Sequence, residues 1–359
     1  MRFAFVLTNL AGGGAEKAVL KIAAALLEEG HAASIVLLED LVEHQVPDGV
    51  IVRPLLPAGR LKRGWLGKRL LARGLSRLVS DFTPDVVIST LPFADEVASL
   101  ARLPRHWCRI ANTLSEEIEL LSRQSASKSA RRLRRYRRIY GARPLIAVSQ
   151  GVADDLREKL QIRSPIRVIG NPFDLEQIRA LAVKVDTRIP NVPYVIHVGR
   201  FAPQKRHDLL LDAWTRISTG HRLVLLTRDS PELRAMIAAR GLSARVSIAG
   251  FQANPYPWIR GAALLVLCSD HEGLPNVLIE SLICGTPVVS TDCPSGPREI
   301  LAGQFPQALV PRGDVFALAC TIERTLENPP DLEGADLSRF GKASVARSFV
   351  ALGSEAGHA

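Results

Sequence analysis

The sequence predicts an α/β fold with two doubly wound domains, each built around a parallel sheet. The chain has 359 residues, of which 47% are hydrophobic, and this is enough material for two separate cores. Its two halves show a similar alternation of short apolar runs and segments with helical spacing of apolar residues. One complete βαβ unit can be followed along residues 263–291.

That βαβ unit begins with a buried strand and continues into a helix. The apolar run Ala263–Cys268 is too short for a buried helix and is followed by polar residues, so we expect a parallel strand. Proline suits the first position of a helix, and we therefore expect a helix from Pro275 to Cys284. The next strand is expected at Val288–Thr291. Ligands of such units bind beyond the carboxyl ends of the strands.

Two carboxylates and one helix N-terminus meet at that carboxyl end. Glu272 follows the first strand, and Glu280, in the second turn of the helix, leans back toward the same ligand. The first N–H groups of the helix attract phosphate, and they belong to Leu274, Asn276 and Val277. A sugar and a ribose joined by a diphosphate would satisfy this set of groups. The spacing also fits an ordinary βαβ unit with two solvated glutamates.

Another expected strand in the same half leads to two cations. Tyr194–Arg200 is expected to be a strand, with Arg200 at its carboxyl end and Lys205 five residues later. Two cations at this spacing can clamp one diphosphate. In isolation such residues are more often partners in surface salt bridges, but here they face Glu272 and Glu280 across the same strand ends.

A glycine-rich loop follows the first expected strand, Phe3–Leu7. Gly12–Gly14 lets the backbone approach a ligand closely before the helix expected at Glu16–Glu28. The dinucleotide pattern G-x-G-x-x-G fails because Lys17 occupies its last position, although the acidic pair Glu39–Asp40 stands where a ribose ligand would. The loop is either part of a ligand site or a purely structural turn.

The net charge of +10 is concentrated in the N-terminal half of the chain. Residues 1–187 hold 29 Lys and Arg against 20 Asp and Glu, a net +9, whereas residues 188–359 hold 17 against 16, a net +1. Two runs contain no acidic residue: residues 60–77 hold seven basic residues and residues 123–143 hold nine. Such runs bind anionic lipid or other polyanions, or are merely solvated faces.

The first of these basic runs is interleaved with apolar residues at helical spacing. They are Leu61, Trp65, Leu66, Leu70, Leu71, Leu75 and Leu78. A helix of this kind suits the surface of an anionic membrane. The pattern also fits a helix that packs on the core and has a basic outer face.

Two further observations bear on location. No apolar run approaches the roughly 20 residues that span a bilayer. The five cysteines are scattered and contain no C-x-x-C pair, so disulfide and zinc sites are poorly supported. We therefore expect a protein of the reducing cytoplasm.

In its motifs the chain resembles the family-4 glycosyltransferases of GT-B fold. Their signature E-x7-E matches Glu272 and Glu280, and the turn at residues 284–290 matches as well. Further matches extend over nearly the whole length, at Ala11–Lys17, Val148–Ser149, Gly170–Pro172, Val198–Phe201 with Lys205, and Gly250–Phe251. Each match alone is weak, but together they are specific.

The resemblance implies two Rossmann-like domains whose parallel sheets face each other across a cleft. We expect an acceptor-binding domain at 1–173, a linker with two prolines at 174–193 and a nucleotide-sugar-binding domain at 194–335. The remaining segment, 336–359, is expected to hold a helix that crosses back to the first domain.

The resemblance also implies roles for individual residues. The expected catalytic residues are Glu272, Arg200 and Lys205. The expected donor-binding residues are Gly13, Gly14, Gly250, Phe251, Leu274, Asn276, Val277 and Glu280. Many relatives carry a histidine near the end of the strand expected here at Cys108–Thr113, and this chain does not. We therefore expect Asn112 and Glu116 to contact the acceptor or the transferred sugar, and His106 to lie at the far end of that strand.

The implied reaction is the retaining transfer of a hexose or N-acetylhexosamine in the synthesis of bacterial polysaccharide, lipopolysaccharide or lipid-linked glycan. The donor would be a nucleoside diphosphate sugar, with UDP preferred to GDP, and the acceptor a hydroxyl of a saccharide or lipid-linked molecule. No D-x-D pair follows a strand, so we expect no metal and no other cofactor, with Arg200 and Lys205 in the place of a metal. The expected partners are donor, acceptor and the anionic inner face of the cytoplasmic membrane, bound peripherally by the N-terminal domain, and no nucleic acid.

Two other classes of protein stay open. An NAD-dependent enzyme that modifies nucleotide sugars would use the first glycine loop, but its fingerprint is broken and no Tyr-x-x-x-Lys pair is recognisable. A polyanion-binding protein would use residues 123–143, but it would not need Glu272, Glu280, Arg200 and Lys205 together.

Overall fold

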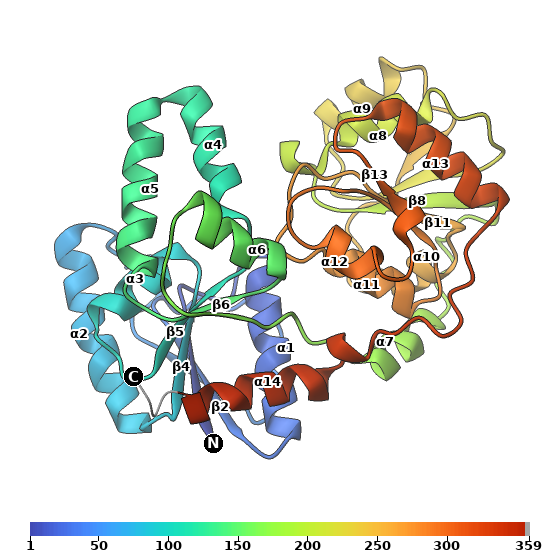
Figure 1. Cartoon of the computed structure of the whole chain (residues 1–359). Helices are drawn as coiled ribbons and strands as arrows, with labels where there is room; N and C mark the ends of the chain where they lie inside the picture. Colours follow the sequence, from blue (N-terminus) through green and yellow to red (C-terminus); the bar gives the residue numbers. More distant parts are fainter. Residues whose placement is uncertain (356–359) are drawn as a thin grey trace. The chain divides into compact units, whose positions relative to one another are not determined.

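The computed structural model describes residues 1–355 and divides into two compact α/β units (Figure 1). The first unit holds Met1–Phe173 together with the chain from Ser338 onward, and the second holds Asp174–Leu337. The segment expected to be a linker, 174–193, belongs instead to the second unit. It begins with helix α7 (Leu175–Ala182), because the Asp174 side chain accepts a hydrogen bond from the Gln177 N–H and caps this helix.

The first unit contains a seven-stranded parallel sheet in the order β3-β2-β1-β4-β5-β6-β7. Its strands are β1 (Arg2–Leu7), β2 (Ala32–Leu37), β3 (Ile51–Pro54), β4 (Val86–Thr90), β5 (His106–Ile110), β6 (Leu145–Ala147) and β7 (Ile166–Val168). The strand expected at Cys108–Thr113 therefore starts and ends earlier, and His106 is its first residue. The central strands of the sheet, β4 and β5, are buried on both faces, as expected of a parallel sheet.

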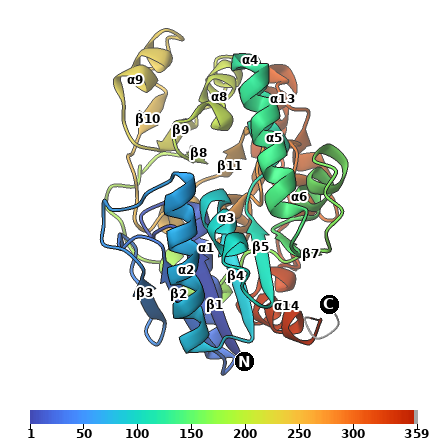
Figure 2. The same ribbon diagram turned by 90° about the vertical axis from the view of Figure 1, so that its left-hand side faces the viewer.

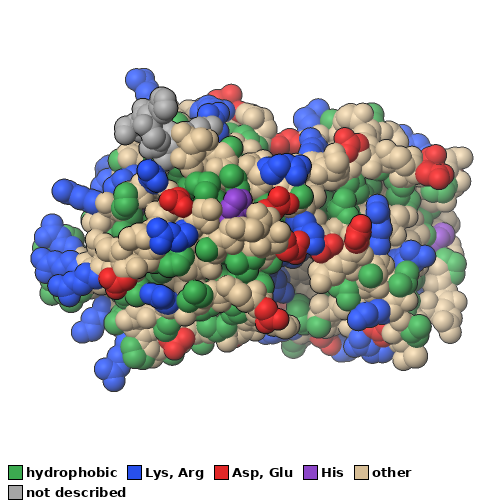
Figure 3. Space-filling view, turned by 90° about the horizontal axis from the view of Figure 1, so that it is seen from below, with side chains coloured by type: hydrophobic (Ala, Val, Ile, Leu, Met, Phe, Trp, Pro, Cys, Tyr) green, Lys and Arg blue, Asp and Glu red, His purple; other side chains and the backbone are tan. Residues whose placement is uncertain are grey.

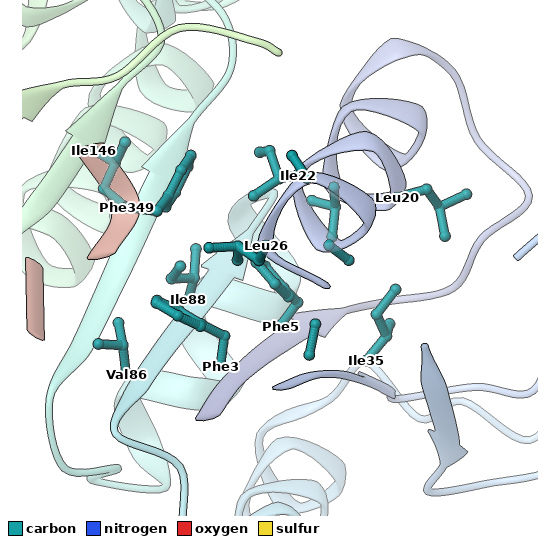
Figure 4. Packing of buried hydrophobic residues seen from close by; sticks show 14 of the residues in the cluster. Phe3, Phe5, Leu20, Ile22, Leu26, Ile35, Val86, Ile88, Ile146 and Phe349 are labelled. Atoms are coloured by element: carbon teal, nitrogen blue, oxygen red, sulfur yellow. The ribbon is translucent and has the colours of Figure 1, made fainter. Parts of the chain in front are cut away.

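Helices cover both faces of this sheet. They are α1 (Gly14–Glu28), α2 (Trp65–Phe82), α3 (Pro92–Leu100), α4 (Leu114–Gln124), α5 (Ala126–Tyr140), α6 (Gln150–Asp154), continued by a π-helical turn at Asp155–Lys159, and α14 (Lys342–Glu355). On one face, Phe3 and Phe5 of β1 pack against Ile22 and Leu26 of α1 and Phe349 of α14 (Figure 4). On the other face, apolar residues of α2 and α3 form a second cluster with the sheet.

The terminal helix was expected within 336–359. A short 3₁₀ turn at Ser338–Phe340 precedes α14, which packs against α1 of the first unit. The Phe173 N–H donates to the Phe340 carbonyl, so the chain re-enters the first unit beside the point where it left. Among the described residues, no helix combines the length and the apolar composition needed to cross a membrane.

The second unit contains a six-stranded parallel sheet in the order β10-β9-β8-β11-β12-β13. Its strands are β8 (Tyr194–Val198), β9 (Arg222–Leu226), β10 (Val246–Ile248), β11 (Leu264–Leu267), β12 (Val288–Thr291) and β13 (Leu309–Val310). Its other helices are α8 (His207–Trp214), α9 (Pro231–Ala238), α10 (Tyr256–Arg260), α11 (Asn276–Ile283), α12 (Pro297–Leu301) and α13 (Val315–Glu327). The helix expected at Pro275–Cys284 is α11, and Pro275 is its N-cap.

Each sheet reverses its strand order once. In the first unit the reversal lies between β1 and β4, and in the second it lies between β8 and β11. Loops from neighbouring strands diverge at such a switch point and leave room for ligands beyond the carboxyl ends. The fold therefore favours ligand binding in two regions, the loops after β1 and β4 and the loops after β8 and β11.

Candidate functional site

An ion pair joins the two loops at the switch point of the second unit. Lys205 ends a 3₁₀ turn, Pro203–Lys205, in the loop after β8, and Glu272 lies in the loop after β11. The Lys205 Nζ donates to the Glu272 Oε1 at 2.6 Å, and the two side chains are 18% and 10% exposed. The structure thus brings together two of the three residues predicted to be catalytic.

Further hydrogen bonds and ion pairs hold the same two loops together. The Asp270 N–H donates to the Gln204 carbonyl at 2.9 Å, and the Gln204 Nε2 donates to the His271 carbonyl at 2.5 Å. Arg206 adds two ion pairs, to Asp208 and to Asp270, both at 2.9 Å. Hydrogen bonds to Asp208 and the Asp270 carboxylate hold the pKa of the Arg206 guanidinium above its usual range. The sequence analysis assigned no role to Arg206.

Two buried histidines lie behind this loop, and sequence reasoning missed both. The rings of His197 and His207 are 4.7 Å apart and meet edge to face, and the His197 Nδ1 lies 2.8 Å from the Val266 carbonyl oxygen. Burial lowers the pKa of His197 to about 3 and that of His207 to about 4, so both imidazoles are neutral at neutral pH. A β-carbon at Gly199 would lie 3.3 Å from the His197 Nε2, so glycine lets the backbone pass close to this ring.

The loop before α11 is fixed by a second turn that packs on it. The Glu272 N–H donates to the Pro294 carbonyl at 3.2 Å. Gly296 has a φ of 102°, and a β-carbon there would lie 2.3 Å from the Pro275 Cδ. Only glycine fits this position, because both the backbone angle and the contact exclude a side chain. The first turn of α11, with Asn276 and Val277, therefore starts from a constrained loop.

Glu280 and Arg200 belong to the segments that follow β11 and β8, the two strands at this switch point. Glu280 is half-buried in the second turn of α11 and accepts a long hydrogen bond, 3.5 Å, from the Tyr256 hydroxyl. Burial and the Glu280 charge hold the pKa of Tyr256 above its usual range, so its hydroxyl stays a donor. Arg200 lies two residues beyond β8 and is exposed.

Two of the expected donor-binding residues, Gly250 and Phe251, lie after β10. Gly250 has a φ of 77°, a conformation that by itself accounts for glycine at this position. The Phe251 side chain that follows is 72% exposed. An aromatic ring with this exposure presents apolar surface on which a base could stack.

The predicted residues Gly13, Gly14, Asn112 and Glu116 belong to the first unit. Gly13 is the N-cap of α1 and Gly14 its first residue. A β-carbon at either glycine would meet no described atom within 4 Å, so the packing of the fold does not require glycine there. Asn112 is exposed between β5 and α4, and its side chain accepts the Thr113 N–H, whereas Glu116 lies in the first turn of α4.

Much of the second basic run is engaged within the first unit, because α5 packs on α3 and α4 (Figure 2). Glu96 of α3 is buried and pairs with Arg135 at 2.7 Å and Arg138 at 2.8 Å, and also with Lys68 of α2 at 2.7 Å. Burial alone would raise the pKa of Glu96. The hydrogen bond from Lys68 and the charges of Arg135 and Lys68 outweigh burial, so the pKa of Glu96 lies below its usual value. One carboxylate thus ties both basic helices to the unit.

The first basic run divides between core and surface. Leu71 and Leu75 of α2 are buried in the core, whereas Trp65 is 67% exposed and Leu66 and Leu70 are also exposed. The Arg69 guanidinium lies over the Trp65 ring, 4.2 Å from its centroid. Figure 3 shows Lys and Arg side chains gathered at the end of the first unit where Figure 1 draws α2. Both interpretations of this helix therefore apply, each to a different face.

Comparison with known families gives matches on both halves of the chain. The family described as "Glycosyltransferase Family 4" matches residues 12–177. The family described as "Glycosyl transferases group 1" matches residues 192–328. The first match lies in the first unit except for its last four residues, and the second lies in the second unit.

Curated relatives carry related names. The chain is 36% identical over 156 residues to the N-acetylgalactosamine-N,N'-diacetylbacillosaminyl-diphospho-undecaprenol 4-alpha-N-acetylgalactosaminyltransferase of Campylobacter jejuni. This match covers 42% of this chain and 42% of the relative. It is 27% identical over 201 residues to the lipopolysaccharide 1,6-galactosyltransferase of Escherichia coli, which covers 52% of this chain and 54% of the relative. The matches span about half the length of these relatives.

Solved structures show the same fold over the full length. The Anabaena protein HepE in complex with UDP and glucose has a TM-score of 0.76 and 19% identity, covering 99% of this chain and 100% of that one. The apo form of the lipopolysaccharide outer core galactosyltransferase WaaB has a TM-score of 0.69 and 19% identity, covering 98% and 99%. At this level of identity the likeness shows the fold alone.

Proposed function

Because the chain belongs to the family-4 glycosyltransferases, of GT-B fold, we propose that it transfers a sugar from a nucleoside diphosphate sugar to a hydroxyl group of a saccharide or lipid-linked acceptor. The observation that carries this proposal is the pair formed by Lys205 and Glu272 at the switch point of the second unit. A largely buried cation paired with Glu272, four residues before α11, and the first N–H groups of that helix are both suited to a diphosphate, because both stabilise negative charge.

In the proposed reaction the diphosphate leaves and gains negative charge. Lys205, Arg200 and the N–H groups at the start of α11 stabilise that charge, which commonly supplies the largest catalytic contribution. Glu272 holds the Lys205 ammonium in place before the donor binds. When a diphosphate arrives, it competes with Glu272 for this ammonium, and the Glu272 carboxylate is then available to accept a sugar hydroxyl.

The donor we propose is a UDP-sugar, and the transferred group a hexose or N-acetylhexosamine. The names of the relatives support this choice, since they include an N-acetylgalactosaminyltransferase and a galactosyltransferase, and HepE was solved with UDP. Glu280 accepts hydroxyls of the ribose, and Phe251 stacks on the base. Retention of configuration is proposed from the family resemblance.

We further propose that the acceptor is lipid-linked and that the first unit meets an anionic membrane surface at the cytoplasmic face. The relative from Campylobacter jejuni is named for an undecaprenol diphosphate acceptor and the Escherichia coli relative for lipopolysaccharide. On this chain, the exposed Trp65, Leu66 and Leu70 stand beside Arg69 and Arg73 on α2. Apolar side chains flanked by arginines suit the interface of an anionic bilayer.

A binding screen tests the proposed reaction. UDP, GDP, NAD and a short RNA are titrated by calorimetry, and a panel of nucleotide sugars is then assayed for donor hydrolysis and transfer. The proposal expects binding of a nucleoside diphosphate alone, with UDP the tighter. Binding of NAD would favour the nucleotide-sugar-modifying enzyme, and binding of RNA alone would favour a polyanion-binding protein.

A further inference from the structure

Arg109, in the first unit, is a fully buried arginine with no carboxylate partner among the described residues. It is the fourth residue of β5 and is 1% exposed. Its Nη2 donates to the Asn171 Oδ1, whereas the buried Nε and Nη1 have no hydrogen-bond partner in the described part of the chain. Burial lowers the pKa of Arg109 to about 10, so the guanidinium is charged at neutral pH.

An unpaired charge in a protein interior is unusual, because removing it from water is costly without a compensating partner. Other shielded arginines of this chain are compensated: Arg135 pairs with Glu96, and Arg206 pairs with two aspartates. No carboxylate in the described part of the chain pairs with Arg109 in this way. A charge retained in this way fits a site that an anion neutralises when it binds.

The surroundings of Arg109 point the same way. Thr90, the last residue of β4, is the register partner of Arg109, and its buried Oγ1 also lacks a hydrogen-bond partner among the described residues. β4 is one of the two strands at the switch point of this sheet, and Arg109 lies on the strand beside it, one residue before that strand's carboxyl end. Asn171 belongs to the Gly170–Pro172 motif, for which the proposed reaction supplies no role. The exposed Asn112, predicted to contact the sugar or acceptor, is three residues from Arg109.

We propose that Arg109 and Thr90 form a binding site for an anionic group, a carboxylate or a phosphate, carried by the acceptor. That the anion belongs to the acceptor rests on the proposed glycosyl transfer; that the site takes an anion does not. Arginine binds both groups with charge-assisted hydrogen bonds, and the threonine hydroxyl adds a donor. Because the guanidinium is buried, the segments that cover it have to move to admit the anion.

Thermal unfolding in the presence of simple anions tests the site. Wild type, Arg109→Met and the matched control Arg163→Gln are unfolded in inorganic phosphate, in acetate and in chloride of equal ionic strength. Arg163 is an exposed arginine of the same unit. A ligand of the folded state raises the unfolding midpoint, so phosphate or acetate should raise it for wild type and for Arg163→Gln but not for Arg109→Met. The anion that does so identifies the chemistry.

Two results would overturn the site. An equal response of wild type and Arg109→Met would place the anion elsewhere, for example at Lys205 and Arg200. A lack of response in wild type, together with a fall in the midpoint of about 5 °C or more for Arg109→Met in chloride, would make the guanidinium a structural group. The proposal expects Arg109→Met to be at least as stable as wild type in chloride, because the substitution removes an unpaired buried charge.

The acceptor assignment has its own measurement. Transfer is compared for pairs of acceptors that differ only in one phosphate or carboxylate, with UDP binding measured in parallel. Arg109→Met should lower transfer to the acidic acceptor about 10-fold or more, leave transfer to the neutral one near wild type and leave UDP binding unchanged, whereas Arg109→Lys should recover part of the loss. Equal loss on both acceptors would overturn the assignment. A wild type that binds no nucleoside diphosphate would refute the proposed function, and the anion response would still decide the site.

Discussion

The Lys205 ammonium lies 2.6 Å from the Glu272 carboxylate across 67 residues of sequence, and both side chains are largely shielded from solvent. The pair places a cation and a hydrogen-bond acceptor at one point of the second unit. It also makes the two side chains depend on each other, because the loss of either leaves the other charge poorly compensated.

The first prediction separates the roles of this pair. Lys205→Met should weaken UDP binding by about 10-fold or more, because the diphosphate loses a charge-assisted partner. Glu272→Gln should bind UDP as tightly as wild type or more tightly, because the competing carboxylate is gone, yet it should lose transfer. Calorimetric titration with UDP and a transfer assay give the two values. Weaker UDP binding by Glu272→Gln than by Lys205→Met would refute the competition.

The second prediction concerns the two residues of the proposed site that lie outside the pair. Glu280→Ala and Arg200→Ala should each lower transfer at least ~100-fold, as expected for the loss of a charged hydrogen-bonding group that stabilises the transition state. Circular dichroism should stay native-like, because Arg200 is exposed and Glu280 is only half-buried. Near-normal turnover of a folded variant would remove that residue from the site.

The third prediction concerns metal. We propose that transfer survives exhaustive treatment with EDTA, because Lys205, Arg200 and the N–H groups at the start of α11 stabilise the negative charge of the diphosphate. The measurement is the rate of transfer after chelation and after adding back Mg²⁺ or Mn²⁺. A loss of activity that either ion restores would show that a metal shares this role.

The fourth prediction concerns the membrane. Wild type should sediment with vesicles that contain phosphatidylglycerol at low salt, and less so at high salt, because each basic residue near the surface contributes ~1 kcal/mol that salt screens. Replacing the exposed Trp65, Leu66 and Leu70 with Ser should weaken this binding, as should Arg131→Gln with Arg134→Gln. Arg132 and Arg135 are left intact because they pair with Glu117 and Glu96, so their loss would disturb the fold.

A matched control for this experiment removes exposed apolar residues elsewhere. Val183 and Val185 of the second unit are 61% and 92% exposed, and their replacement with Ser should leave vesicle binding unchanged. If wild type ignores anionic vesicles even at low salt, a soluble acceptor becomes the better assignment.

The fifth prediction uses the buried Asp95 of α3. Burial raises the pKa of Asp95 to about 7, against which hydrogen bonds from Ser89 and Tyr140 act. Between its ordinary pKa of 3.8 and about 7, the folded state therefore holds a proton that the unfolded state has lost. This contribution to stability is fully present below pH 3.8 and is lost as the pH rises to about 7.

The measurement compares the free energy of unfolding of wild type and Asp95→Asn at pH 5 and pH 8. The variant should gain stability relative to wild type on going from pH 5 to pH 8, by up to about 3 kcal/mol. The comparison with the variant matters because His106, His197 and His207 have lowered pKa values, which make stability fall as the pH falls. An unchanged difference between the two proteins at the two pH values would show that Asp95 does not titrate in this range.

Periodicity and local chemistry determined much of the fold in advance. Apolar runs such as Tyr194–Val198 and Leu264–Leu267 predicted buried strands, and the proline and glycine that bracket α11 predicted that helix to within one residue at each end. These are local signals, because a strand or helix boundary depends on the residues beside it. The segment expected to be a linker, 174–193, lies in the second unit, since the Asp174 cap starts a helix there and that helix packs on α10 and α11.

Contacts between distant segments needed the tertiary structure. The sequence placed Lys205 and Glu272 at two strand ends, but only the order β8-β11 in the sheet makes those ends neighbours. Likewise, no local signal shows that Arg135 and Arg138 pair with Glu96, or that Gly296 must be glycine because Pro275 packs against it.

The sequence by itself thus determined which residues carry charge, which segments are strands and helices, and which family the motifs resemble. The tertiary structure decided which of those charges are compensated. That distinction separates Arg206, which pairs with two aspartates, from Arg109, which has no carboxylate partner among the described residues. The reason is physical: the energy of a charge depends on burial and on neighbours within a few ångströms, and sequence separation fixes neither.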